Sequence, residues 1–200
     1  FEAAESHLNT TDHLELASIV RDAERHPNVS YYLLKHSAIS NLYGVDIMPE
    51  AVEIARLRLF LKLISQVQKR IEVEPLPDLE FNICCGNALV GALGAEQVRG
   101  RVDLFSSAKV DELVATAGTI ADAYREFAAQ QERGDQVLMQ RSKQRLYELV
   151  EGVRERLDRW WYDSDHHDDE FEGYLVRVRP FHWFVEFPDA FAHGGFDVVI

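Results

Sequence analysis

Apolar residues are most densely patterned between positions 41 and 63 (NLYGVDIMPEAVEIARLRLFLKL). The pattern predicts a short buried strand over 42–45, a turn, and a helix that begins at Pro49, a residue suited to the first helical turn. Two apolar stripes follow helical spacing. The first contains Val52, Ala55, Leu59 and Leu63, and the second contains Ile54, Leu57, Leu61 and Ile64. A helix that is apolar over so wide an arc is expected to be largely buried against a sheet.

The turn between this strand and helix carries candidate chemistry. Asp46 follows the strand, and open α/β sheets bind ligands at the carboxyl ends of their strands. A carboxylate there can accept hydrogen bonds from both hydroxyls of a ribose, while Ile47 offers an apolar surface to an adenine ring. The alternative is that Asp46 only caps the helix that begins at Pro49. The stretch by itself leaves both interpretations open.

A second strand is predicted over residues 79–85 (LEFNICC), where Gly86 ends it and Asn87 follows. If this strand lies parallel to the first, Asp46 and Asn87 meet at the same edge of the sheet. An amide at that edge can hydrogen-bond the edge of a base. The alternative is that Asn87 only shapes the turn.

Residues 107–162 show a different pattern, with apolar positions recurring every three or four residues on both sides of a turn at 132–135 (ERGD). This predicts an antiparallel helical hairpin, inserted between core elements. Basic residues gather on its second helix, but acidic residues interleave with them. We therefore expect a structural or partner-docking arm rather than a DNA-contacting one.

The remaining segments complete an α/β pattern. A helix is expected from Thr10 or Thr11 to about His26 and a second one from Ser30, leading into the first strand. Further strands are expected at 174–178 and at 196–200 (FDVVI), with an aromatic-rich short helix between them. The predicted organisation is a first core part over 1–106, the hairpin over 107–162, and a return to the core over 163–200.

Length and charge limit the classes of partner that this chain is expected to bind. Its 200 residues suit one domain or a piece of a larger one, and a chain that starts at Phe1 and stops in a strand is expected to be such a piece. The formal net charge of −13 argues against direct contact with nucleic acid, which requires clustered lysine and arginine. No apolar run is long enough to cross a bilayer, so a membrane partner is not expected.

Cysteines and histidines give little sign of a metal site. Cys84 and Cys85 are neighbours in a predicted strand, so they point to opposite faces and are not expected to form a disulfide or a metal pair. This usage suits a reducing, cytoplasmic compartment. The acidic run at 163–172 contains His166 and His167, but its spacing matches no known metal loop and predicts a solvated segment.

Four stretches together resemble a known enzyme family: residues 41–63, LEFNICCGNALVG, HWFVEF and GGFDVVI. They are similar to S-adenosylmethionine-dependent DNA adenine-N6 methyltransferases, and most similar to the large type IIG restriction-modification and BREX phage-defence enzymes. The resemblance covers residues 30–95 and 180–200. It implies that the chain holds strands two, three and four of a partial Rossmann-like class I methyltransferase sheet, interrupted by the helical hairpin.

The same resemblance implies roles for individual residues. Asp46 would hold the ribose of S-adenosylmethionine, and Ile47 would flank its adenine. Asn87 would contact the adenine amino group, at a position where many members carry aspartate. Ala88 and Leu89 would line the same pocket. The catalytic Asn-Pro-Pro-Tyr loop and the glycine-rich cofactor turn are expected outside the chain, so no catalytic residue and no metal ligand is nominated within it.

The implied activity is methyl transfer to adenine N6 in double-stranded DNA, on a base flipped out of the duplex. Its DNA contacts would come from elsewhere in the full-length protein, other defence-system subunits would be further partners, and this chain alone would be inactive. Two alternatives stay open. One is a nucleotide-dependent oxidoreductase or epimerase, in which an acid after a strand also binds ribose. The other is a non-catalytic scaffold whose hairpin recruits partners.

Overall fold

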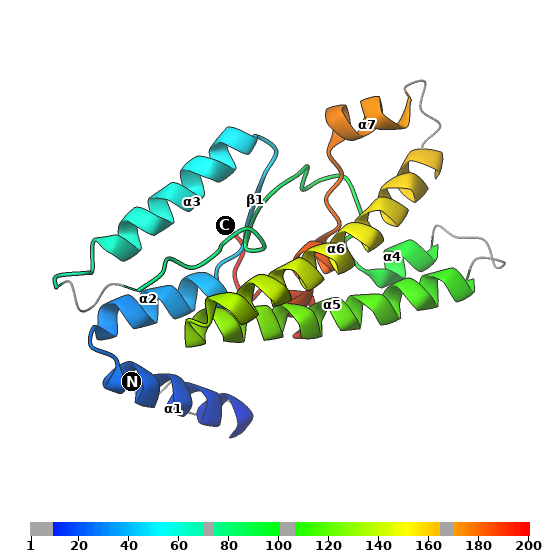
Figure 1. The fold of residues 1–200 in the computed structure, drawn as a ribbon. Helices are drawn as coiled ribbons and strands as arrows, with labels where there is room; N and C mark the ends of the chain where they lie inside the picture. The colour runs from blue at the N-terminus through cyan, green and yellow to red at the C-terminus, as the bar shows by residue number, and fades with distance from the viewer. Residues whose placement is uncertain (1–9, 70–73, 101–106, 165–169) are drawn as a thin grey trace.

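The computed structural model describes residues 10–69, 74–100, 107–164 and 170–200 of the chain, and it is mostly helical with a small parallel sheet (Figure 1). The elements are, in order, α1 (Thr10–Arg25), α2 (Val29–Ser40), β1 (Gly44–Asp46), α3 (Pro49–Ile64), β2 (Ile83–Cys85), α4 (Ala95–Gly100), α5 (Ser107–Arg133), α6 (Gln136–Ser164), α7 (Phe171–Val178), α8 (Trp183–Glu186) and α9 (Pro188–Ala192).

The two strands lie parallel and side by side. Gly44 pairs with Ile83 and Asp46 with Cys85. The N–H of Gly44 donates to the carbonyl of Asn82 at 2.8 Å, and the N–H of Gly86 donates to the carbonyl of Asp46 at 2.9 Å. Both strands therefore end at the same edge, as the sequence predicts.

Side chains of the strands alternate between two apolar layers, because successive residues of a strand face opposite sides. Ile83 packs with Ala38, Val52 and Leu79 on the side of α2 and α3. Cys84 packs on the other side in a cluster whose buried members are Phe181, Phe187 and Ala190. The aromatic segment after residue 180 thus covers one face of the sheet, as short helices α8 and α9.

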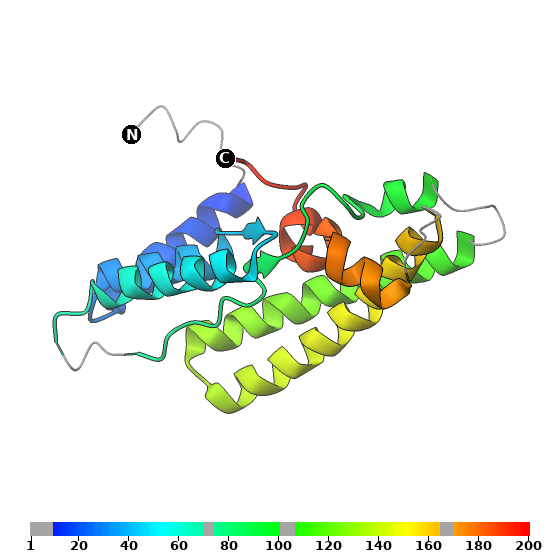
Figure 2. The same ribbon diagram turned by 90° about the horizontal axis from the view of Figure 1, so that it is seen from above.

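The largest core lies between the two long helices α5 and α6, which run side by side in both views (Figure 2). Gly134 joins them in a turn with φ of +72°, a value that favours glycine. Fully buried Ile120 and Phe127 of α5 pack with Leu146 and Leu157 of α6. This core continues to Phe81 and Val185, which connects the helix pair to the elements around the sheet.

The prediction of a strand at 174–178 is wrong, because these residues belong to helix α7. Helical spacing explains the difference once Phe171 is included: Phe171, Tyr174 and Val178 recur at intervals of three and four. Tyr174 is fully buried, and both Phe171 and Tyr174 pack against the ring of Tyr162 on α6.

The expected strand at 196–200 does not form either. Val198 and Val199 are 78% and 80% exposed, and within the described residues no strand lies beside them. An extended segment needs a neighbour to pair its backbone groups. The sheet of the described residues therefore consists of the first two expected strands, without the third core strand that the family resemblance implies at 196–200. The second strand is also shorter than expected, since residues 79–83 form a turn closed by the Ile83 N–H and the Leu79 carbonyl.

Helix α3 is less buried than its sequence suggests. Val52 and Leu63 of the first stripe are buried, but the second stripe faces outward. The exposed fraction is 58% for Ile54, 55% for Leu57, 56% for Leu61 and 49% for Ile64. The expectation of a largely buried helix is therefore wrong, because two strands and α2 cover only one side of α3. Among the described residues, no helix combines the length and apolarity needed to span a membrane.

Candidate functional site

Asp46 closes the turn that leads from β1 into α3. Its Oδ1 accepts a hydrogen bond from the N–H of Met48 at 2.8 Å. The N-cap position of α3 is Met48, so Asp46 shapes the turn before the helix instead of capping it. The Asp46 side chain is exposed at the edge where both strands end, and its second oxygen can accept from a ligand.

Asn87 lies at the same edge, two residues after the end of β2. Its Oδ1 accepts from the N–H of Leu89 at 3.1 Å, and its own N–H donates to the carbonyl of Arg179 at 2.7 Å. The turn-forming role considered for Asn87 is therefore present. The structure also brings Asn87 and Asp46 to one end of one parallel pair, which the nucleoside interpretation requires.

Exposed apolar side chains stand beside these two polar residues. Ile47 is 47% exposed and Leu89 is 94% exposed. Ala88 is exposed as well, and its carbonyl accepts from the indole N–H of Trp183 at 3.0 Å. Because the side chains of Ile47 and Leu89 are so exposed, they are available to flank the flat ring of a ligand.

The glycines around Asn87 let its loop wrap closely around Phe181. A Cβ on Gly86 would lie 2.6 Å from the Phe181 ring. Gly91 has φ of +130°, and a Cβ there would lie 2.3 Å from the Phe181 carbonyl oxygen. The N–H of Phe181 donates to the carbonyl of Val90 at 2.7 Å. The glycine spacing of GNALVG signals a close backbone approach, although the sequence does not show which segment approaches.

Arg179 is the residue at this edge that sequence reasoning missed. Its Nη1 donates to the carbonyl of Ile47 at 2.8 Å and lies 3.9 Å from the Sγ of Cys85. It lies 132 positions from Ile47 along the chain. No periodicity or motif links residues so far apart, so the only sequence signal is its place directly before Pro180.

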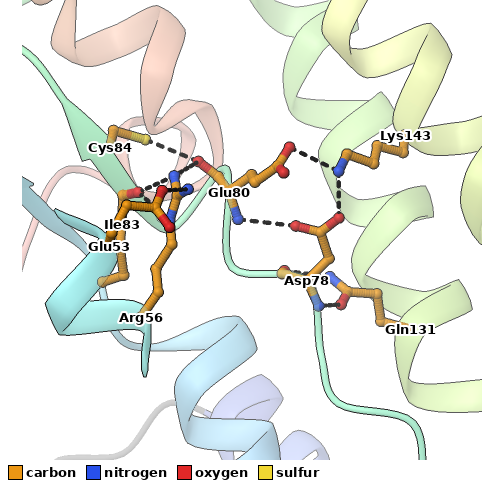
Figure 3. Close-up of polar contacts among 8 residues, drawn as sticks. All are labelled: Glu53, Arg56, Asp78, Glu80, Ile83, Cys84, Gln131 and Lys143. Atoms are coloured by element: carbon orange, nitrogen blue, oxygen red, sulfur yellow. Dashed lines mark hydrogen bonds and ion pairs between the residues drawn. The ribbon is translucent and has the colours of Figure 1, made fainter. Parts of the chain in front are cut away.

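A polar network on α3 holds the start of β2 (Figure 3). Arg56 donates to the carbonyl of Ile83 from Nη2 at 2.6 Å and from Nε at 3.1 Å. It also reaches the carbonyl of Glu80 at 3.3 Å and the carboxylate of Glu53 at 3.2 Å. This one guanidinium therefore fixes β2 relative to the helix that follows β1.

The segment that leads into β2 is held from the other side by the long helices α5 and α6 (Figure 3). Lys143 on α6 contacts the carboxylates of Asp78 and Glu80 at 2.5 and 2.7 Å. Gln131 on α5 accepts from the backbone N–H of Asp78 at 2.5 Å and donates to its carbonyl at 3.2 Å. Residues 78–83 are thus held between α3 and the α5–α6 pair, so the site edge rests on all three helices.

Two buried polar pairs connect α6 to the segment after residue 180. Fully buried His182 accepts the N–H of Ala92 at Nδ1 (2.9 Å), so Nε2 carries the proton and donates to Asp158 at 3.1 Å. Arg154 contacts both oxygens of Glu186, at 2.6 and 3.1 Å. Burial lowers the pKa of the Arg154 guanidinium, but the carboxylates of Glu186, Glu151 and Asp158 together raise that pKa by more.

Other candidates for chemistry lie away from this edge or lack the right groups. Burial raises the pKa of the Cys84 thiol, which disfavours the nucleophilic thiolate. Neither Cys84 nor Cys85 forms a disulfide. In the described ranges no three His, Cys, Asp or Glu side chains gather as a metal site would require; His166 and His167 lie outside those ranges. An open hollow of about 490 Å³ lies between α5 and α6 and includes Trp160 in its wall, but none of its lining residues is at the strand ends.

Comparison with known proteins identifies one family. Residues 40–200 match the family described as Eco57I restriction-modification methylase. The chain is also 48% identical over 75 residues to a putative type II restriction enzyme and methyltransferase of Methanocaldococcus jannaschii. That match covers 30% of this chain and 6% of the relative, so the chain corresponds to a small part of that protein's length. No solved structure matches the chain.

Proposed function

This chain belongs to the Eco57I restriction-modification methylase family, and we propose that in the complete protein it forms the nucleoside-binding part of an S-adenosylmethionine site. The proposal rests on one observation: the parallel strands β1 and β2 bring Asp46 and Asn87 to a single edge. Ile47 and Leu89 are exposed beside them.

The residues present fit the nucleoside half of this cofactor. The second oxygen of Asp46 would accept from the ribose hydroxyls, because Met48 occupies only Oδ1. Ile47 and Leu89 would flank the adenine ring, and Ala88 would line the pocket between them. The Asn87 side chain would contact the base edge, since an amide both donates and accepts. The contribution of this chain is therefore binding and orientation.

The proposed reaction of the complete protein is methylation of adenine N6 in double-stranded DNA. S-adenosylmethionine would supply the methyl group. The residues named here would hold its nucleoside in a fixed place, which favours transfer through proximity and alignment. Because the chain carries a net charge of −13, the phosphate contacts would come from other parts of the protein.

Calorimetric titration of the complete protein with S-adenosylmethionine tests the binding proposal. The variant of choice is Asp46→Asn, because an asparagine oxygen still accepts the Met48 N–H and preserves the turn. We expect its dissociation constant to rise about 5- to 150-fold, which corresponds to a cost of about 1–3 kcal/mol for poorly paired hydroxyls. Glu148→Gln, an exposed carboxylate on α6, is the matched control and should bind as the wild type does. Equal affinity of Asp46→Asn and wild type would remove Asp46 from the site.

Product analysis tests the acceptor separately. The complete protein is incubated with duplex DNA and radiolabelled S-adenosylmethionine, and the DNA is digested to nucleosides and separated. We expect the label in N6-methyladenine. Label in a methylated cytosine would disprove the adenine assignment while leaving the cofactor site intact. The absence of both label and binding heat would instead favour a scaffold.

A further inference from the structure

We infer that Arg179 is a positioning residue for the proposed nucleoside site, because it joins the two loops that carry the site residues. Its side chain holds the carbonyl of Ile47 at 2.8 Å, and its backbone carbonyl holds the N–H of Asn87 at 2.7 Å. Arg179, which follows helix α7, therefore bridges the β1 turn and the β2 turn, beside the direct bond from the Gly86 N–H to the Asp46 carbonyl. This inference rests on the proposed function.

The backbone of Arg179 is unusual in a way that requires an explanation. Its φ and ψ are 51° and 60°, the left-handed region, and no other non-glycine residue of the described ranges has positive φ. It also precedes Pro180, and a residue before proline ordinarily takes an extended backbone. Strained residues of this kind persist where their surroundings hold them, and they are frequent at functional sites.

An ordinary role at the end of a helix does not explain why an arginine is present. Arg179 follows the last residue of α7, and its N–H donates to the carbonyl of Leu175 at 3.0 Å. Left-handed residues at this position of a helix end are usually glycine, which adopts the conformation without steric cost. The hydrogen bond to Leu175 and the bond to Asn87 both use backbone atoms, so glycine would keep them. What the arginine adds is the hydrogen bond from its side chain to the Ile47 carbonyl and a longer contact, at 3.9 Å, with the Sγ of Cys85.

Charge pairing does not explain that contact either. No carboxylate among the described residues forms an ion pair with Arg179. Its guanidinium donates instead to the neutral carbonyl of the residue proposed to flank the adenine. By fixing that peptide, Arg179 sets the direction of the Ile47 side chain and the entry of the turn closed by Asp46 and Met48.

The variant Arg179→Gly separates positioning from folding, because it removes the side-chain contact and also the backbone strain. We expect the complete protein to keep or raise its melting temperature, while the dissociation constant for S-adenosylmethionine rises about 5- to 10-fold. In turnover assays the KM for the cofactor should rise with kcat nearly unchanged. Arg179→Lys should recover part of the affinity, and Arg177→Ala, which removes a neighbouring charge, should leave it unchanged.

Amide hydrogen exchange without cofactor keeps this test independent of the proposed function. In Arg179→Gly we expect faster exchange over residues 46–48 and unchanged exchange at Asn87, whose backbone partner remains. Wild-type exchange over 46–48 would overturn the inference. So would wild-type affinity, or a loss of affinity that only follows a loss of melting temperature. If the wild type binds no S-adenosylmethionine but the exchange pattern holds, the proposed function fails while the positioning role of Arg179 stands.

Discussion

The Asp46 carboxylate has enough acceptor capacity for two roles at once. An ionised carboxylate offers about four lone-pair directions, and the Met48 N–H uses one of them on Oδ1. Turn formation and a ribose contact are therefore compatible, and the turn bond also fixes the rotamer that a ligand would meet. The same holds for Asn87, whose Oδ1 accepts from Leu89 while a second lone pair and the amide hydrogens remain for the site.

Glu74 provides a pH-dependent contribution to stability. Its oxygens contact Lys35 at 2.7 Å and His26 at 2.6 Å. Burial raises the pKa of the Glu74 carboxyl, but the hydrogen bonds and charge interactions with Lys35 and His26 together lower it by more, so the pKa lies below the ordinary 4.5. A carboxyl with a lowered folded-state pKa stabilises the fold above its unfolded pKa. This contribution is lost as the pH falls through the folded-state value.

Glu74→Gln should therefore flatten the acid limb of the stability curve. We expect the free energy of unfolding to change less between about pH 5 and pH 3 in Glu74→Gln than in the wild type. Urea unfolding at a series of pH values measures the difference. Glu148→Gln serves as the control and should keep the wild-type slope. An unchanged slope in Glu74→Gln would show that the pairing with Lys35 and His26 does not matter.

At the scale of elements, local periodicity predicted α1, α2, α3, α5 and α6, but it missed α4, predicted a strand where α7 lies and predicted a strand at 196–200 that does not form. The start of α2 depends on the capping residue Asn28, the start of α3 on Pro49, and the turn between α5 and α6 on Gly134. Each of these residues acts within a few positions of the chain. The edge holding Asp46 and Asn87 followed from the rule that parallel strands end together. Residues 196–200 were misjudged, because a strand depends on a neighbour that its own sequence does not specify. Arg179 was missed for the same reason.

Substitutions in the pair formed by Arg154 and Glu186 test how α6 supports the segment after residue 180. The Glu186 side chain is 8% exposed and accepts two hydrogen bonds from Arg154. Arg154→Met leaves this buried carboxylate without its cation, so we expect a loss of about 3 kcal/mol of unfolding free energy in urea titration. Adding Glu186→Gln to Arg154→Met should cost less than the two single changes summed, because the unpaired charge is gone. Additive losses would mean that the two side chains do not interact.

At the scale of the whole molecule, α3 divides into a covered face and an open face. Leu63 on the covered face is 2% exposed, whereas Leu57 on the other face is 55% exposed. Soluble monomers rarely leave contiguous apolar stripes of this kind open, and such stripes mark surfaces where another segment or chain binds. The match to only 6% of the relative's length leaves ample chain in that protein to cover the equivalent stripe.

Leu57→Ala and Leu63→Ala are a matched pair that tests this division, since the same atoms are removed from opposite faces of one helix. In the 200-residue chain, we expect Leu63→Ala to cost about 2–4 kcal/mol of unfolding free energy and Leu57→Ala less than about 0.5 kcal/mol. Equal losses that grow with protein concentration would mean that the chain associates through this stripe. Repeating the pair in the complete protein is informative, because a cost for Leu57→Ala that arises only there would place a neighbouring segment on the open face of α3.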